Sequence, residues 1–325
     1  PASLRSQLML SIAVPIITLL LALALVGFFG VTKLIEAQVQ QRDAELTRLA
    51  ARQIAAYWSD SVLLLSQIAS TDEVRSGETV LVTQMLAVNT PLQQRFDRIA
   101  VTDVGGVVIA AYGGSIGEQY GEADFFQRTR QVRRPVRSPV ITDHTGQSMV
   151  LVAIPYYGTN REFGGCVLGV WQLQGGHALG ASLENVRIGE TGFSYLVDMN
   201  GTVLSHPETS LIGADARQHP AVALFLSGQE GAVSVSERGE RTVVGFARVP
   251  FRDLPTSVFA DETWDGWGMF ITEYWHDIVS PLRPWIYLII LLFAATVALP
   301  LGVLAIGSQR VAAPLQNLVS EVGRV

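Results

Sequence analysis

The sequence predicts an α+β protein in which two antiparallel-sheet modules are stacked along a long N-terminal stalk helix and flanked by two transmembrane helices. Two uncharged apolar stretches lie near the ends of the 325-residue chain, and a helical pattern without glycine or proline follows the first. A strand–turn–strand motif then occurs twice. The chain is 49% hydrophobic and 16% charged, with a mean hydropathy of +0.31, which is too apolar for an ordinary soluble protein.

The two apolar stretches cover residues 8–31 and 284–306, and each is long enough to cross a bilayer as a helix. Neither contains a charged residue, and aromatic residues such as Phe28 and Trp285 lie near their ends, as is typical of membrane interfaces. The alternative for the first stretch is a cleaved signal peptide. However, its apolar run is about twice as long as the apolar region of a usual signal peptide, and no small-residue cleavage site follows it.

Two spans place both termini on one side of the membrane and residues 34–283 on the other. This segment has 19 arginines, no lysine and 28 acidic residues, which gives a formal charge of −9. Because positive charge near short flanks keeps them in the cytoplasm, we expect cytoplasmic termini and an acidic periplasmic or extracellular domain on the inner (plasma) membrane. An acidic domain offers phosphates no electrostatic attraction, which argues against nucleic-acid partners.

The stalk helix is predicted over residues 32–70. Apolar residues recur there at steps of three and four, among them Leu46, Leu49 and Trp58, and no proline or glycine interrupts the pattern. The apolar stripe can contact a second copy of the chain, which would give a homodimer through the stalk and transmembrane helices. The alternative is that the helix packs only on its own domain.

From residue 71 the pattern changes to short β-runs separated by turns. Two apolar runs joined by Asp-x-x-Gly occur twice: Asp103 and Gly106 mark the first copy, and Asp198 and Gly201 mark the second. The aspartate accepts hydrogen bonds from the turn and the glycine permits a left-handed backbone, so each copy predicts a tight hairpin.

The repeat divides the external segment into a membrane-distal module, residues 71–175, and a membrane-proximal module, residues 176–283. A helix follows each hairpin, at residues 124–132 and at residues 216–226, and further strands follow each helix. Because helices do not separate the strands regularly, the pattern favours antiparallel sheets.

These features resemble a double Cache sensor region, a pair of PAS-like modules found in bacterial transmembrane receptors. The resemblance covers nearly the whole external segment. It is carried by the long helix, the paired hairpins, and the motifs Thr191-Gly-Phe-Ser-Tyr-Leu-Val-Asp198, Ser205-His206-Pro207 and Trp267-Gly-Met-Phe. After the second span, Arg310-Val-Ala-Ala-Pro314 is similar to the opening of a HAMP linker, which we place at residues 307–325.

The resemblance implies the sensory half of a signal-transduction receptor. A small extracellular ligand would bind the distal module, and the second span and HAMP would pass the signal to a cytoplasmic output. We rank a histidine kinase first, and a methyl-accepting chemoreceptor or a nucleotide-cyclase receptor second. A membrane-anchored protein-binding module without signalling is a further alternative, and an external enzyme is the weakest.

Amino-acid-binding members of the family carry an Arg-x-Trp-Tyr-like signature on the distal helix and an aspartate on the last strand of the module. Here Ala123-Asp-Phe-Phe126 and Gly169-Val-Trp171 stand at those places. The signature residues are replaced, so we do not predict amino-acid binding.

An arginine-rich stretch in the distal module suggests where a ligand binds. If a helix begins near Ala123, Phe126 and Arg130 share a face, and Arg128 points elsewhere. We expect Arg130 to contact an anionic or polar ligand, or to pair with nearby acids. The expected ligand-contacting set is completed by one serine and three aromatic residues that either line a pocket or belong to the core: Ser138, Tyr112, Tyr156 and Trp171.

No metal, cofactor or catalytic residue is predicted. The single cysteine, Cys166, excludes an intrachain disulfide and lies in an apolar run that predicts a packed thiol. The five histidines lack metal-ligand spacing. The chain also lacks a phosphate-binding loop, a nucleophile elbow and a paired-carboxylate motif.

Overall fold

The computed structural model describes residues 4–142, 146–173, 178, 183, 191–237, 239–251, 266–296, 298 and 302. The chain divides into two units, one of which is Gln40–Trp275 and the other Pro1–Val39 with His276–Val325. The expected linker at residues 307–325 and most of the expected boundary near residue 175 lie outside the described residues.

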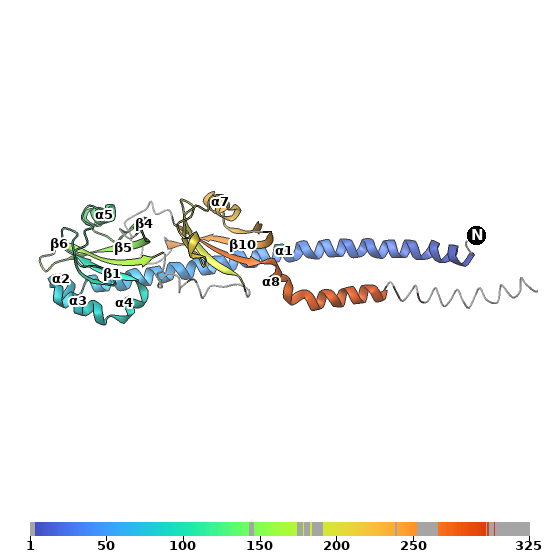
Figure 1. Cartoon of the computed structure of the whole chain (residues 1–325), viewed down its shortest axis with the longest axis horizontal. Coiled ribbons are helices and arrows are strands. Elements are labelled where there is room, and N and C mark those ends of the chain that lie inside the picture. The colour runs from blue at the N-terminus through green and yellow to red at the C-terminus, as the bar shows by residue number, and fades with distance from the viewer. Residues whose placement is uncertain are drawn as a thin grey trace, which may run out of the picture. The chain divides into compact units, whose positions relative to one another are not determined.

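Helix α1 runs from Leu4 to Ala69, so the helices predicted at residues 8–31 and 32–70 form one continuous helix of 66 residues (Figure 1). Within the unit Gln40–Trp275, its inner face buries apolar residues spaced three or four apart: Ile54, Trp58, Val62 and Leu65. Leu46 and Leu49 are exposed on another face. The predicted apolar stripe is therefore divided between the chain's own core and the surface.

The other unit contains the N-terminal part of α1, the helical turns that end at Leu282, and the helical residues 283–296. Among the residues that the structure describes, no helix has the length and apolarity that a membrane span requires.

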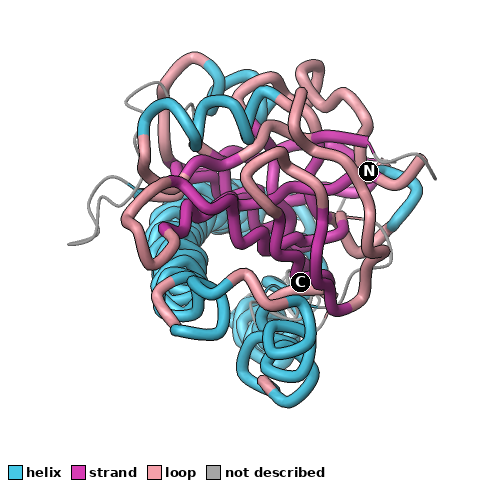
Figure 2. The backbone as a smooth tube through the Cα atoms, turned by 90° about the vertical axis from the view of Figure 1, so that its left-hand side faces the viewer, coloured by secondary structure: helices cyan, strands magenta, loops and turns pink. Residues whose placement is uncertain are grey.

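The first module contains a six-stranded antiparallel sheet in the order β2-β1-β6-β5-β3, with β4 paired to β5. Its strands are β1 (Arg98–Thr102), β2 (Val108–Tyr112), β3 (Val136–Arg137), β4 (Ile141–Thr142), β5 (Ser148–Tyr157) and β6 (Phe163–Gln172). Helices lie on both sides of the strands (Figure 2), which explains why β5 and β6 are buried at nearly every position.

The two faces of the first sheet pack against different helices. Val150 and Trp171 belong to the apolar cluster around α1, whereas Leu151 and Leu168 pack beneath α5 (Asp124–Val132). Because side chains alternate along a strand, the position of a residue in β5 or β6 decides which helix it faces. Helix α5 has the bounds that the sequence predicts.

Three helices precede this sheet, so the predicted β-runs from residue 71 are wrong for this stretch. They are α2 (Asp72–Ser76), α3 (Thr79–Val88) and α4 (Thr90–Arg95). The β-branched residues of α3 favour a strand only where their neighbours suit one. In α3, Val82 and Leu86 lie four positions apart and are fully buried, while the helix packs against β2. Burial of that helix face outweighs local propensity.

The second module contains a five-stranded antiparallel sheet in the order β8-β7-β11-β10-β9. Its strands are β7 (Phe193–Asp198), β8 (Val203–Ser205), β9 (Gly231–Glu237), β10 (Glu240–Arg248) and β11 (Trp267–Tyr274). Helix α7 (Pro220–Leu226) packs on β9 and β10 and is shorter than the predicted helix at 216–226. It starts late because proline favours the first turn of a helix, where its missing N–H costs nothing.

The paired hairpins share one hydrogen-bonding pattern, so the repeat extends from sequence to geometry. In each, the aspartate Oδ1 accepts the N–H groups two and four residues later, at 2.9 Å for Asp103 and 2.8 Å for Asp198. Gly106 and Gly201 have φ angles of 85° and 83°, a left-handed conformation that glycine adopts without strain.

A tryptophan cluster, defined as Trp58, Trp171 and Trp267, joins both modules to α1. Trp58 stacks on Trp171 of β6 with ring centroids 4.0 Å apart, and Trp267 of β11 meets it edge-on at 4.8 Å. Each indole is at most 1% exposed. The two modules and α1 therefore share one continuous apolar core.

Gly245 of β10 allows the second sheet to approach α1 closely. A Cβ at this position would lie 2.7 Å from the carbonyl oxygen of Asp43 and would also meet the Thr47 hydroxyl. Nearby, Arg42 forms ion pairs with Asp43, at 2.8 Å, and with Glu273 of β11. Polar and steric contacts thus fix α1 against the second sheet.

Candidate functional site

Helix α5 positions the predicted arginines on the first module. Phe126 is buried on its inner face, where its ring meets Phe163 edge-on at 5.9 Å. Arg130, one turn later, is exposed, and it forms no ion pair with any described residue. Arg128 lies 3.7 Å from Asp124. The helix thus anchors itself through its phenylalanines and presents Arg130 to solvent.

Tyr156 and Trp171 lie on the opposite face of the same sheet, within the core around α1. The Tyr156 hydroxyl donates to the carbonyl oxygen of Thr102 at 2.9 Å. Burial, together with the nearby Asp103 carboxylate, raises the pKa of Tyr156 to about 12. Trp171 stacks on Trp58. Both residues therefore have structural partners of their own.

The remaining two candidates are also separated. Tyr112 is directly opposite Ile99 in the β1–β2 pairing and is partly exposed at the end of β2. Ser138 is buried, and its hydroxyl accepts the Leu151 N–H at 3.0 Å. Because the sheet separates Phe126 from Tyr156 and Trp171, the seven predicted residues do not line one pocket.

A polar cluster that the sequence analysis did not identify lies beside β2. Glu118 accepts a hydrogen bond from Arg98 and another from the Tyr120 hydroxyl, both at 2.7 Å. Burial alone would raise the pKa of Glu118, but Tyr120 and the Arg98 charge hold it below its ordinary value. These groups satisfy one another, which gives the cluster a structural role.

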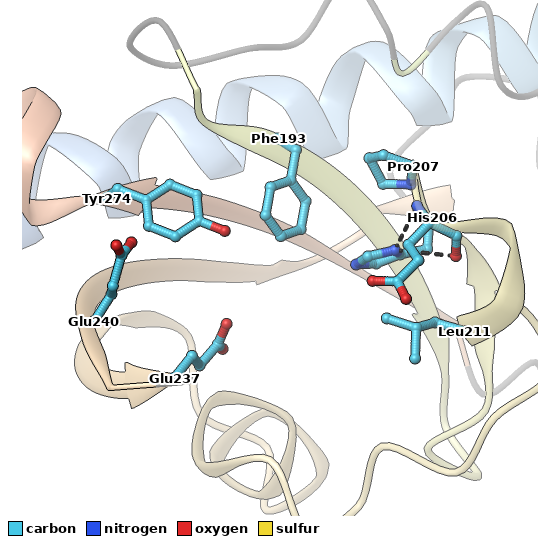
Figure 3. Close-up of a pocket in the computed structure, with 8 residues that line it drawn as sticks. Phe193, His206, Pro207, Leu211, Glu237, Glu240 and Tyr274 are labelled. Atoms are coloured by element: carbon cyan, nitrogen blue, oxygen red, sulfur yellow. Dashed lines mark hydrogen bonds between the residues drawn. The ribbon is translucent and has the colours of Figure 1, made fainter.

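The second module contains an open cleft of about 440 Å³ that the sequence analysis also missed (Figure 3). Four separate segments contribute to it, and its wall includes Phe193, His206, Leu211, Glu237, Glu240 and Tyr274. Phe193 and Tyr195 pack in the cluster beneath α7, on the face opposite α1. The cleft therefore lies on the face that corresponds to the α5 face of the first module.

Carboxylates dominate the charge of this cleft. Glu237 points into it (Figure 3), and one of its oxygens lies 2.5 Å from Nε2 of His219. Glu240 is exposed at the start of β10, and Glu208 adds a third acid at the rim. Below the cleft, burial and the charge of Glu237 raise the pKa of Tyr195. The negative field of Glu237 thus extends into the module.

His206 is held in a fixed orientation at the other side of the cleft. Its Nδ1 accepts the backbone N–H of Glu208 at 2.9 Å and also lies 3.3 Å from the Glu208 carbonyl oxygen. Its ring meets Phe193 edge-on at 5.1 Å and Tyr195 at 5.5 Å. The aromatic wall is therefore a packed surface.

Neither a metal centre nor a reactive thiol is found in the part of the chain that the structure describes. No group of three or more His, Cys, Asp or Glu residues there is placed to hold a metal ion. Cys166 is a free, fully buried cysteine, and burial raises the pKa of its thiol, which keeps it protonated and unreactive.

Comparison of the sequence with models of known protein families identifies the family to which this fold belongs. The model of a double Cache family, described as Cache domain, matches residues 31–282. The chain belongs to the Cache domain family. No curated protein matched the chain.

Several solved Cache-type ligand-binding domains are similar to this chain in fold. The Pseudomonas fluorescens chemoreceptor CtaA with L-isoleucine is 18% identical, with a TM-score of 0.53 over 78% of this chain and 98% of that one. The Pseudomonas aeruginosa PAO1 amino acid chemoreceptor PctC with GABA is 18% identical, with a TM-score of 0.50 over 70% and 96%. Mlp24 with asparagine is 15% identical, with a TM-score of 0.52 over 77% and 98%. At these identities the likeness shows the double Cache fold.

Proposed function

We propose that this chain is the sensory half of a two-pass transmembrane receptor that binds a small external molecule. The observation that carries the proposal is the double Cache fold between two uncharged apolar stretches, residues 8–31 and 284–306. Ligand binding would favour one arrangement of the helices over another, and the difference in affinity would set the size of the response.

The membrane topology can be tested by labelling. Cys166 is buried and its thiol pKa is raised, so the native chain already has an unreactive background. In intact cells, a membrane-impermeant maleimide should label Glu73→Cys, on the exposed surface of α2, and should not label Arg324→Cys. Labelling of both, or of Arg324→Cys alone, would contradict the two-pass topology.

The ligand of the first module is proposed to be anionic or polar rather than an amino acid. The similar domains CtaA, PctC and Mlp24 hold amino acids or GABA. Here the sheet face beneath α5 presents Cys166, Leu168 and Val170, which offer no carboxylate to an ammonium group. The exposed guanidinium of Arg130 favours an anion instead, and Arg128, which points to another side of α5, adds positive charge to the same helix. In this arrangement Phe126 and Ser138 support the site from within.

Thermal unfolding of the full chain in lipid nanodiscs, with dicarboxylates, sugar acids and inorganic phosphate as probes, tests this site. A ligand at 100 times its Kd should stabilise the chain by about 2.7 kcal/mol. Arg130→Ala should abolish the stabilisation, and Arg52→Ala, an exposed arginine on α1, should not. Absence of any stabilising probe, or full affinity in Arg130→Ala, would contradict the proposal.

A homodimer through α1 is proposed from the outer face of this helix. Leu46, Leu49, Ala56 and Leu63 are exposed, and the last three recur every seven residues, which is the repeat of a coiled coil. Under oxidising conditions, Leu49→Cys should therefore form a disulfide between two chains, whereas Arg48→Cys, an exposed position about 100° away around the helix, should not. Equal crosslinking of the two variants would contradict a dimer in this register.

The output is proposed to be a histidine kinase, with a chemoreceptor as the second candidate, by analogy with receptors of this architecture. The coding sequence beyond the codon for Val325 distinguishes them. A His-bearing helix pair and an ATP-binding domain would support the kinase. A few hundred residues of unbroken heptads would support the chemoreceptor, and an immediate stop codon would contradict signalling through a cytoplasmic domain.

A further inference from the structure

We propose that the cleft of the second module is a separate binding site for a small organic cation, such as an amine or quaternary ammonium compound with an apolar body. This site goes beyond the proposed function, because the ligand proposed above binds the first module through arginines.

The cleft has the size and shape of a ligand site. Its volume of about 440 Å³ falls within the range of roughly 300–1,000 Å³ that small-molecule pockets occupy. Its walls come from the ends of β7, β9, β10 and β11 and from the segment after β8 (Figure 3). Strand ends fixed by a continuous sheet provide a preformed site, which lowers the entropic cost of binding.

The charge of the cleft selects a cation. Glu237 and Glu240 lie on one side of the cleft (Figure 3), Glu208 adjoins His206 through its backbone N–H, and no described residue of the wall is a lysine or arginine. Arg238, between the two glutamates in the sequence, lies outside the described residues. His219 lies 2.5 Å from Glu237, and a neutral imidazole that donates to this carboxylate leaves its negative charge in place. Arg217 pairs with Asp215, and Arg241 lies 4.4 Å from the centroid of the Trp275 ring.

The aromatic wall favours an organic cation over a metal ion. The rings of Phe193 and Tyr274 border the same space as the Glu237 carboxylate (Figure 3), with centroids 6.4 Å apart. The negative face of an aromatic ring attracts an ammonium group, and its apolar surface accommodates the carbon body. A metal ion would need at least three ligating side chains in one place, and the described residues contain no such group.

Helix α7 packs on β9 and β10, where Val222 and Phe225 are buried, and the cleft adjoins the same face of the sheet at Phe193 of β7. Beneath α5 of the first module, Phe125 and Phe126 fill the face of the sheet that points away from α1. On the corresponding face of the second module, Phe193 is only partly buried and the space beside it is open. This face of the second module is therefore filled beneath α7 and open at the cleft, where Glu237 and Glu240 lie.

Binding of matched probes to the full chain in nanodiscs, measured by calorimetry, tests the proposal. Phenethylamine and 3-phenylpropionate share a phenylethyl body and carry opposite charges. Choline and 3,3-dimethylbutan-1-ol share a shape and differ only in the positive charge. We expect the cations, with agmatine as a third, to bind and the anionic and neutral analogues to bind at least about tenfold more weakly, which is about 1.4 kcal/mol.

Variants locate the site. Glu240 is exposed, so Glu240→Gln should weaken phenethylamine binding about two- to fivefold, and Glu237→Gln/Glu240→Gln at least about tenfold. Tyr274→Leu should weaken choline binding more than it weakens agmatine binding, since it removes a π face. Glu73→Gln, an exposed glutamate of the first module, is the matched control and should bind as the parent does.

Three results would overturn the proposal. The first is that none of the three cations binds at about 10 mM, the weak end of specific affinity. The second is that 3-phenylpropionate binds Arg130→Ala, which lacks the proposed anion site, as tightly as phenethylamine does. The third is that cation binding is unchanged by Glu237→Gln/Glu240→Gln but lost in Arg130→Ala, which would move the ligand to the first module. The first two results leave anion binding at Arg130 open, whereas the third would place a cation there and contradict both proposals, so the failures of the two proposals can be told apart.

Discussion

Replacement of Trp58 by alanine tests whether one core holds both modules. The side chain is 1% exposed and contacts Trp171 at 4.0 Å, Trp267 at 4.8 Å and Phe251 at 6.0 Å between ring centroids. Truncation of a buried tryptophan costs about 3–5 kcal/mol. We therefore expect Trp58→Ala to lower the free energy of unfolding by about 4 kcal/mol, which is roughly 8–16 °C in the thermal midpoint for a domain of this size.

Thermal unfolding of the full chain in detergent micelles, followed by circular dichroism, measures this effect. Trp58→Phe keeps a ring in the stack and removes an indole N–H that has no hydrogen-bond partner among the described residues, so its loss should be less than about half as large. Arg52→Ala, exposed on the same helix, should change stability by no more than about 0.5 kcal/mol. A Trp58→Ala midpoint equal to that of Arg52→Ala would refute the shared core.

Three further predictions concern the hairpins, the Glu118 cluster and the cysteine. Asp103→Ala and Asp198→Ala each remove an acceptor of two backbone N–H groups, so each should cost about 1–3 kcal/mol in chemical denaturation, and a large difference between them would contradict their equivalence. The pKa of Glu118 is held below its ordinary value of 4.5, so its ionised form adds stability that is present above pH 4.5 and lost as the pH falls through the lower, folded-state pKa. Glu118→Gln should accordingly destabilise the chain more at pH 7 than at pH 3, and equal losses at both would show that the charge is irrelevant. The Cys166 thiol should react with a maleimide on the order of 100-fold more slowly in the native chain than in urea, and a rapid native reaction would show that its strand opens.

Local signals in the sequence were sufficient for the hairpins and for α5. The Asp-x-x-Gly turns at Asp103 and Asp198 specify their own hydrogen bonds, so no distant residue is needed to form them. Helix α5 has the predicted bounds because it begins at an acidic residue and ends where Arg133 adopts a left-handed conformation. Helix α3 could not be predicted, because burial of Val82 and Leu86 against β2 is a tertiary effect.

The candidate site was harder to predict because β5 and β6 are buried on both faces. An alternating strand reveals which side chains face the core, but an all-apolar strand does not, so the opposite orientations of Trp171 and Phe126 could not be read from the sequence. The cleft of the second module has no local signature at all. Phe193, Glu237 and Tyr274 are brought together only by the pairing of distant strands. The two motifs Thr191–Asp198, which contains Phe193, and Ser205-His206-Pro207 were sequence signals near it, but neither predicts a cleft.

The shared core determines how the chain can be recombined with other receptors. Trp58 of α1 packs against Trp171 of the first module and Trp267 of the second, and Gly245 of the second module fits against the backbone of α1 at Asp43. A graft that exchanges one module between homologous receptors and keeps the host's α1 would therefore place foreign side chains against part of the buried face of that helix. The exchangeable part is the whole of Gln40–Trp275, helix included. Fusion points for hybrid sensors accordingly belong outside that segment, and a junction between the two sheets would cut through a single packed interior.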